Sequence, residues 1–100
     1  MQNTRRSERK PLLAEVEYES VGARAKAHIK NIGTLGVFIE TELPLSVGVH
    51  LRLKFTLPTG PVIETQGVVA HRQTSAGMGI AFISIGVEEV KHIKEFLDLD

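Results

Sequence analysis

Arginine side chains near the N-terminus give the clearest indication of ligand chemistry in this sequence. Arg5, Arg6 and Arg9 lie within five positions, and the first and last of them are spaced as R-x-x-x-R. A guanidinium group can form paired hydrogen bonds with phosphate or with the O6/N7 edge of guanine, and it can stack on a base. The surrounding arm is too polar and too short to fold alone, so these arginines would act together with another part of the chain.

A second candidate lies in a glycine-rich turn expected at 31–36, which reads Asn-Ile-Gly-Thr-Leu-Gly. Glycine lets backbone N–H groups point toward an anion without obstruction from a side chain. The candidate binding residues are Asn31, Gly33, Thr34 and Gly36. Taken separately, a basic arm is often a solvated terminus and such a turn is often only a turn. Together they predict a site for the phosphate and base of a guanine nucleotide.

Other residue types give no support for catalysis or metal binding. The chain has no cysteine, which excludes disulfides, thiolate zinc sites and cysteine nucleophiles. Its four histidines are not spaced as metal ligands, and its serines lack the sequence context of a nucleophile elbow. Its carboxylates lie on expected exposed strand faces rather than among apolar residues. We therefore expect no enzymatic activity, no metal and no cofactor.

Composition narrows the class of protein further. The 100 residues are 42% hydrophobic and 24% charged, and twelve basic residues balance twelve acidic ones. A neutral chain with one tyrosine and no tryptophan lacks both the basic excess and the aromatic platforms typical of nucleic-acid binding. No apolar run approaches the roughly 20 residues of a membrane helix, and no secretory signal is present. We expect a cytoplasmic protein with neither nucleic-acid nor membrane partners.

The hydrophobic pattern after Pro11 predicts strands. Apolar and polar residues alternate in six segments, separated by turns such as Val21-Gly22 and 58–61. The exposed faces of the first two strands are acidic and basic, so antiparallel pairing would bring opposite charges together. Gly67, inside the long strand expected over 62–72, predicts a bulge or bend.

The last segment of the sequence changes to a helical period. Val87, Val90, Ile93, Phe96 and Leu97 recur at spacings of three and four, which predicts an amphipathic helix with these residues on its buried face. Six short strands would leave exposed edges unless the sheet closed on itself. The expected fold is all-β, a six-stranded antiparallel barrel with one C-terminal helix packed over an opening.

These features together resemble the PilZ family of cyclic di-GMP receptors. Arg5 and Arg9 match its R-x-x-x-R motif, and Asn31 and Gly36 match its [D/N]-x-S-x-x-G motif. The segment 77–82, Gly-Met-Gly-Ile-Ala-Phe, is similar to the last strand of the family. The resemblance covers residues 5 to 97 and implies the same PilZ-type barrel.

One motif position departs from the family pattern. Gly33 stands where the family has serine. The missing hydroxyl would cost about 0.5–1.5 kcal/mol of binding free energy, and water or the Thr34 hydroxyl can replace part of it.

The resemblance implies a receptor that holds cyclic di-GMP without reacting with it. Arg5 and Arg9 would bind guanine edges and phosphates, and Arg6 would add charge or stacking. The 31–36 turn would receive the other guanine, with Gly36 allowing the ligand to approach the backbone.

The implied signal is a change from disorder to order. A mobile basic arm, residues 1–10, would become ordered on a single barrel domain, residues 11–100, and the altered surface would contact an unidentified downstream protein. The alternative is a degenerate PilZ-fold adaptor that binds no nucleotide and acts by protein–protein contact. The arginine pair favours the receptor, whereas Gly33 favours the adaptor.

Overall fold

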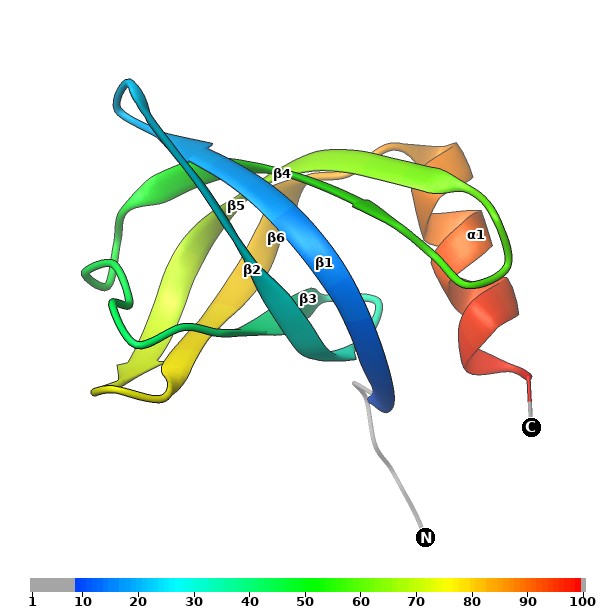
Figure 1. Cartoon of the computed structure of the whole chain (residues 1–100). Helices are drawn as coiled ribbons and strands as arrows, with labels where there is room; N and C mark the ends of the chain where they lie inside the picture. Colours follow the sequence, from blue (N-terminus) through cyan, green and yellow to red (C-terminus); the bar gives the residue numbers. More distant parts are fainter. Residues whose placement is uncertain (1–8, 100) are drawn as a thin grey trace, which may run out of the picture.

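The computed structural model describes residues 9–99, which form six strands followed by one helix (Figure 1). Their bounds are β1 Lys10–Ser20, β2 Ala23–Ile32, β3 Gly36–Glu40, β4 His50–Thr56, β5 Val62–Gln73, β6 Gly77–Ser84 and α1 Val87–Leu97. The strands form a closed barrel in the order β1-β2-β3-β6-β5-β4, and every neighbouring pair is antiparallel. The predicted fold class is therefore confirmed.

The long β1–β2 hairpin follows the predicted charge pattern. Glu17 lies opposite Lys26, and Glu19 lies opposite Arg24. The connecting residues Val21 and Gly22 have φ angles of 44° and 77°. Positive φ at both central positions is the geometry of a two-residue turn whose twist matches that of the strands.

The hydrophobic core fills the inside of the barrel. Alternate side chains along the strands point into it. In β4, for example, Leu51, Leu53 and Phe55 are buried, whereas the polar residues between them are exposed. This alternation is the one that period two predicts for a sheet with one buried face. Gly67 lies at a register shift between β5 and β6, as predicted.

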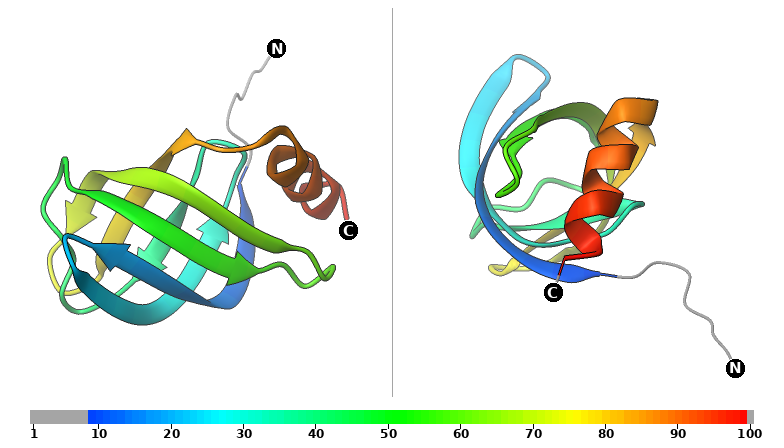
Figure 2. Two further views of the ribbon diagram at one scale, coloured as in Figure 1. Left: turned by 90° about the horizontal axis from the view of Figure 1, so that it is seen from above. Right: turned by 90° about the vertical axis from the view of Figure 1, so that its right-hand side faces the viewer.

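Helix α1 covers one end of the barrel, and Figure 2 shows it lying across that opening. Ile93 and Phe96 are buried in the core, which confirms the predicted orientation of the helix. Val87 is instead 84% exposed, so its predicted place on the buried face is wrong. It is the first residue of the helix, and the core contacts come from residues further along it.

Lys10, the first residue of β1, ties the C-terminal end of α1 to the barrel. Its Nζ donates hydrogen bonds to the carbonyl oxygens of Phe96 at 2.8 Å and Leu99 at 2.6 Å. The same ammonium lies 4.4 Å from the centroid of the Phe96 ring. A cation at this position is favourable because the C-terminal end of a helix carries partial negative charge.

The connection between β2 and β3 is shorter than predicted. The sequence predicts a turn over 31–36, but Asn31 and Ile32 belong to β2 and Gly36 begins β3. Asn31 pairs with Phe38 across the two strands. The turn is therefore limited to 33–35, because pairing with β3 keeps Asn31 extended.

Candidate functional site

A cleft of about 350 Å³ lies on the outer wall of the barrel and brings three of the predicted site residues together. Arg9, Asn31 and Gly36 line it. Its remaining lining residues are Leu35, Val37, Phe38, Ala70, His71, Gly79, Ile80 and Ala81. Within the described part of the chain, the lining contains no carboxylate. The cleft therefore offers the positive charge of Arg9 without a negative charge beside it.

Arg9 and Asn31 are joined directly. Arg9 Nε donates a hydrogen bond of 2.7 Å to Asn31 Oδ1, across 22 positions of sequence. Partial burial lowers the pKa of the Arg9 guanidinium below its usual range. An arginine nevertheless stays charged at neutral pH, and it has five N–H donors. The bond to Asn31 uses one of these, so the two terminal nitrogens keep their donors for an anionic ligand.

The strand register extends this pair into a row of side chains across the barrel wall. Asn31 of β2 lies opposite Phe38 of β3, Phe38 lies opposite Gly79 of β6, and Gly79 lies opposite His71 of β5. The Phe38 and His71 rings are stacked, with centroids 6.1 Å apart and an interplanar angle of 29°. Two neighbouring aromatic rings therefore lie beside the Arg9–Asn31 pair in the same cleft.

Two glycines of β6 make room for these rings. A Cβ atom on Gly77 would lie 2.6 Å from Cε2 of Phe38, and one on Gly79 would lie 2.6 Å from Cδ2 of His71. Both separations are too short for carbon atoms, so glycine at these positions leaves room for the rings. At Gly77 the backbone carbonyl oxygen of Ile39 would lie closer still, so this glycine also serves the packing of β6 against β3. Sequence reasoning missed Phe38 and His71 as site residues. The signal in the sequence was the pair Gly77 and Gly79, which lie two positions apart and therefore on the same face of a strand.

The remaining predicted site residues lie outside the cleft or outside the described chain. In the 33–35 turn, the Gly33 amide donates to the Gly36 carbonyl oxygen at 2.9 Å, and neither Gly33 nor Thr34 lines the cleft. Arg5 and Arg6, with the rest of the predicted mobile arm up to residue 8, lie outside the described residues.

Gly36 has a packing role in the barrel that the sequence did not predict. A Cβ atom there would collide with the carbonyl oxygen of Ile80 in β6. Gly36 is therefore required for β3 to pack against β6. That Gly36 also lets a ligand approach the backbone stays a prediction, and Gly36 does line the cleft.

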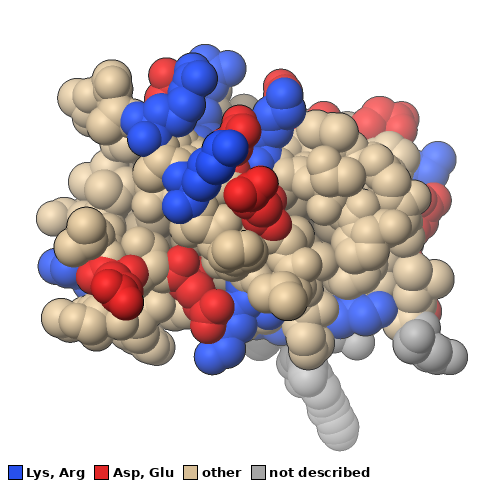
Figure 3. All heavy atoms as spheres, viewed as in Figure 1, with Lys and Arg blue, Asp and Glu red and all other residues tan. Residues whose placement is uncertain are grey.

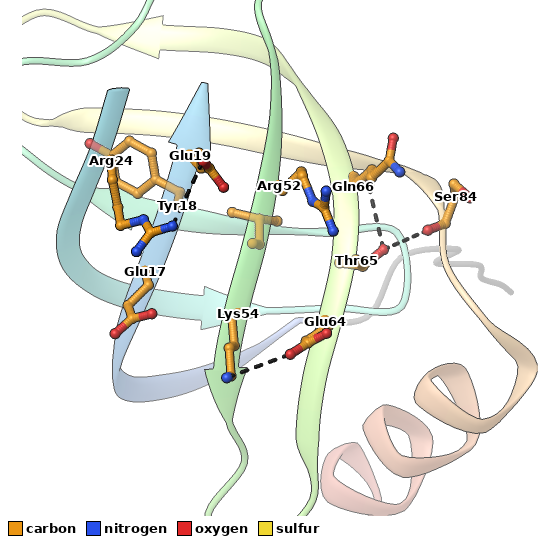
Figure 4. A pocket seen from close by; sticks show the side chains of 11 residues that line it. Glu17, Tyr18, Glu19, Arg24, Arg52, Lys54, Glu64, Thr65, Gln66 and Ser84 are labelled. Carbon is orange, nitrogen blue, oxygen red and sulfur yellow. Dashed lines mark hydrogen bonds and ion pairs between the residues drawn. The ribbon is translucent and has the colours of Figure 1, made fainter. Parts of the chain in front are cut away.

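A larger groove of about 500 Å³ lies on the opposite wall, over β1, β4 and β5 (Figure 4). Its charges are largely paired: Lys54 Nζ lies 3.5 Å from Glu64 Oε2, and Arg24 Nη2 lies 3.8 Å from Glu19 Oε2. Figure 3 shows acidic and basic side chains interleaved on this side of the molecule. The carboxylates would repel a phosphate diester, so the smaller cleft at Arg9 is the better anion site.

Two further observations concern residues 9–99 alone. Within residues 9–99, no three side chains that could bind a metal come together. Across the same residues, no helix is long and apolar enough to cross a membrane.

Comparison with models of known protein families shows to which family the chain belongs. The family model described as PilZ domain matches residues 3–99, which includes both motifs and the whole barrel. The chain belongs to the PilZ domain family. PilZ domains are cyclic di-GMP receptors and adaptors rather than enzymes. No curated protein matches the sequence itself.

Solved structures share this PilZ fold. The Bacillus subtilis inhibitor of motility, MotI/DgrA, superposes with a TM-score of 0.82 at 19% identity, over 95% of this chain and 50% of that one. Borreliella burgdorferi PlzA, in complex with c-di-GMP, superposes with a TM-score of 0.74 at 20% identity, over 96% of this chain and 42% of that one. The PilZ domain of CeSA from a cellulose-synthesizing bacterium superposes with a TM-score of 0.69 at 15% identity, over 91% of this chain and 95% of that one. This PilZ chain thus spans half or less of the first two proteins.

Proposed function

We propose that this PilZ domain is a receptor that binds cyclic di-GMP in the cleft formed by Arg9, Asn31, Phe38 and His71. The observation that carries the proposal is the 2.7 Å hydrogen bond from Arg9 Nε to Asn31 Oδ1. It joins one residue from each family motif and orients the guanidinium before a ligand arrives. A group that is already oriented loses less conformational entropy on binding.

Each part of the cleft has a role that its chemistry supports. The free donors of Arg9 bind a phosphate oxygen or the O6/N7 edge of guanine, both of which accept paired hydrogen bonds from a guanidinium. A guanine base stacks on the Phe38–His71 surface. Arg5 and Arg6, on the arm that precedes the barrel, add positive charge over the bound nucleotide.

The signal that follows is a change of surface. Binding orders the N-terminal arm against the barrel, and a downstream protein in the cytoplasm recognises the new surface. The complex of PlzA with c-di-GMP supports the choice of ligand, since that protein shares the fold.

A calorimetric titration with cyclic di-GMP tests the proposal. The wild-type chain should bind with saturation, and Arg9→Ala should lose about 1.5–3 kcal/mol because a charge-assisted hydrogen bond is removed. Arg9→Lys should recover little of this, since an ammonium lacks the planar pair of donors. Arg24→Ala, on the opposite wall, is the matched control and should bind as the wild type does.

The alternative adaptor function has one observation in its favour, which is glycine in place of serine at position 33. A wild-type chain that shows no heat of binding at millimolar nucleotide would favour the adaptor. Equal binding by wild type and Arg9→Ala would place the nucleotide elsewhere.

A further inference from the structure

Two consecutive residues where the barrel begins hold two distant parts of the chain. Arg9 Nε donates its 2.7 Å hydrogen bond to Asn31 Oδ1 in the cleft on the barrel wall, here named the Arg9 cleft. Lys10 Nζ donates to the carbonyl oxygens of Phe96 at 2.8 Å and Leu99 at 2.6 Å. Figure 2 shows the start of β1 beside the C-terminal end of α1. A single peptide bond therefore joins the residue that lines the cleft to the residue that holds the helix end.

The backbone between these two contacts has little freedom. Pro11 follows Lys10, and a residue that precedes proline is restricted to extended conformations. Lys10 is also paired with Ile32 of β2. In extended backbone, successive side chains point in opposite directions. Lys10 therefore reaches the end of the barrel while Arg9 points to the wall, and fixing one side chain restricts the other.

The start of β1 has a neighbouring strand on one side only. Its pairing with β2 begins at Lys10, whereas its pairing with β4 covers only 16–19. Within the described chain, residues 10–15 thus have no strand partner on the β4 side. The end of a strand with a single neighbour opens readily. The two hydrogen bonds of Lys10, with its ammonium 4.4 Å from the centroid of the Phe96 ring, hold this end of β1 from the other side.

We propose that Lys10 is a positioning residue for the Arg9 cleft. By holding the start of β1 on α1, it keeps Arg9 against Asn31, and the two contacts stabilise each other. Lys10 does not line the cleft, so it acts through Arg9. The extension to nucleotide rests on the proposed function: a ligand that binds Arg9 also stabilises the last turn of α1. By reciprocity, the attached helix raises the affinity for the ligand.

Hydrogen exchange in the nucleotide-free chain tests the coupling without any ligand. Lys10→Met keeps most of the apolar stem and removes the ammonium. Exchange of the Arg9 Nε–H, followed by nuclear magnetic resonance, should accelerate about fivefold, which is the lower end of typical couplings between sites. Lys91→Met makes the same substitution at an exposed position of α1 and should leave this exchange unchanged. Unaltered exchange at Arg9 in Lys10→Met would overturn the proposal.

The reciprocal variant reads the coupling from the other end. The Leu99 amide donates to the Phe96 carbonyl oxygen at 3.2 Å, and the same oxygen accepts a bond from Lys10. Arg9→Ala should therefore accelerate exchange of the Leu99 amide, although it touches neither residue of the helix end. Arg24→Ala, on the opposite wall, is the matched control. If Lys10 only attached the helix, Leu99 would exchange equally in Arg9→Ala and wild type, and the proposal would be wrong.

Calorimetric titration with cyclic di-GMP measures the consequence for binding. Lys10→Met should lower the affinity about fivefold by the same coupling, and Lys10→Arg should retain most of it, since a guanidinium donates to the same carbonyl groups. Lys91→Met should bind as the wild type does. Saturating nucleotide should slow exchange of the Leu99 amide in the wild type but not in Lys10→Met.

The outcomes separate this inference from the proposed function. Wild-type binding with normal affinity in Lys10→Met would overturn the positioning role and leave the receptor function standing. A wild-type chain that binds no nucleotide would refute the receptor function, whereas the exchange of the Arg9 Nε–H and the Leu99 amide would still decide whether Lys10 positions Arg9.

Discussion

Arg9 Nε donates a 2.7 Å hydrogen bond to Asn31 Oδ1, although 22 positions separate the two residues. The contact arises because β1 and β2 are paired, with Pro11 opposite Asn31. The hydrogen bond holds Arg9 at one end of the row of residues that runs from Asn31 through Phe38 and Gly79 to His71. Of the two arginines of the motif, Arg9 is the one that the structure describes. One residue of the arginine motif and two of the turn motif, Arg9, Asn31 and Gly36, therefore lie in a single cleft.

His71 tests the aromatic part of that cleft. His71→Ala removes one of the two stacked rings, and stacking of a base on such a surface contributes about 1–3 kcal/mol. Affinity for cyclic di-GMP should fall accordingly in a calorimetric titration, whereas His71→Phe should keep most of it. His50→Ala, on β4, is the control and should bind normally. Unchanged affinity of His71→Ala would show that no base stacks there.

Gly33→Ser tests the departure from the family motif. The substitution restores the serine of the pattern and should leave the affinity for cyclic di-GMP unchanged or increase it, by up to about tenfold for one hydrogen bond. Titration of the variant beside the wild type measures this. Weaker binding would mean that the turn has adapted to glycine, since the Gly33 site is buried.

Gly36→Ala tests a packing role. The added Cβ would collide with the Ile80 carbonyl oxygen, and backbone atoms of paired strands cannot move aside cheaply. We expect a loss of about 1–3 kcal/mol in the free energy of unfolding, measured by urea denaturation. Gly86→Ala is the matched control, because its new atom would meet only the flexible end of Glu89. A fully stable Gly36→Ala chain would contradict this account of the glycine.

Lys10→Met tests the attachment of α1. It keeps most of the apolar stem but removes the ammonium that binds the Phe96 and Leu99 carbonyl groups. The free energy of unfolding should fall by about 1–2 kcal/mol, and amide exchange at Asp98 and Leu99 should accelerate. Lys30→Met, an exposed lysine of β2, should change neither quantity. Unaltered exchange in Lys10→Met would show that the helix end is held by other contacts.

The architecture could be predicted from the sequence because each element has a clear period. The helix bounds, Val87 to Leu97, agree with the structure, and the alternation in the strands predicts which face is buried. The exposure of Val87 could not be predicted, because it depends on where the barrel ends relative to the helix.

The site could be predicted only in part. Arg9, Asn31 and Gly36 were recognised from motifs, and the structure brings them together. Phe38 and His71 were missed because each occupies an outward position that alternation alone assigns to solvent. Their proximity depends on the strand order β3-β6-β5 and on the register shift between Val69 and His71. Neither property can be read from the period of a single strand.

The most direct test of the account is a nuclear magnetic resonance titration that follows the Arg9 Nε–H and the Asn31 side-chain amide as cyclic di-GMP is added. The account predicts that both signals shift with saturation, together with the ring signals of Phe38 and His71, while the signals of Lys54 and Glu64 in the groove on the opposite wall stay unchanged. Saturable binding that leaves the Arg9 and Asn31 signals in place, or no shift at millimolar nucleotide, would contradict it.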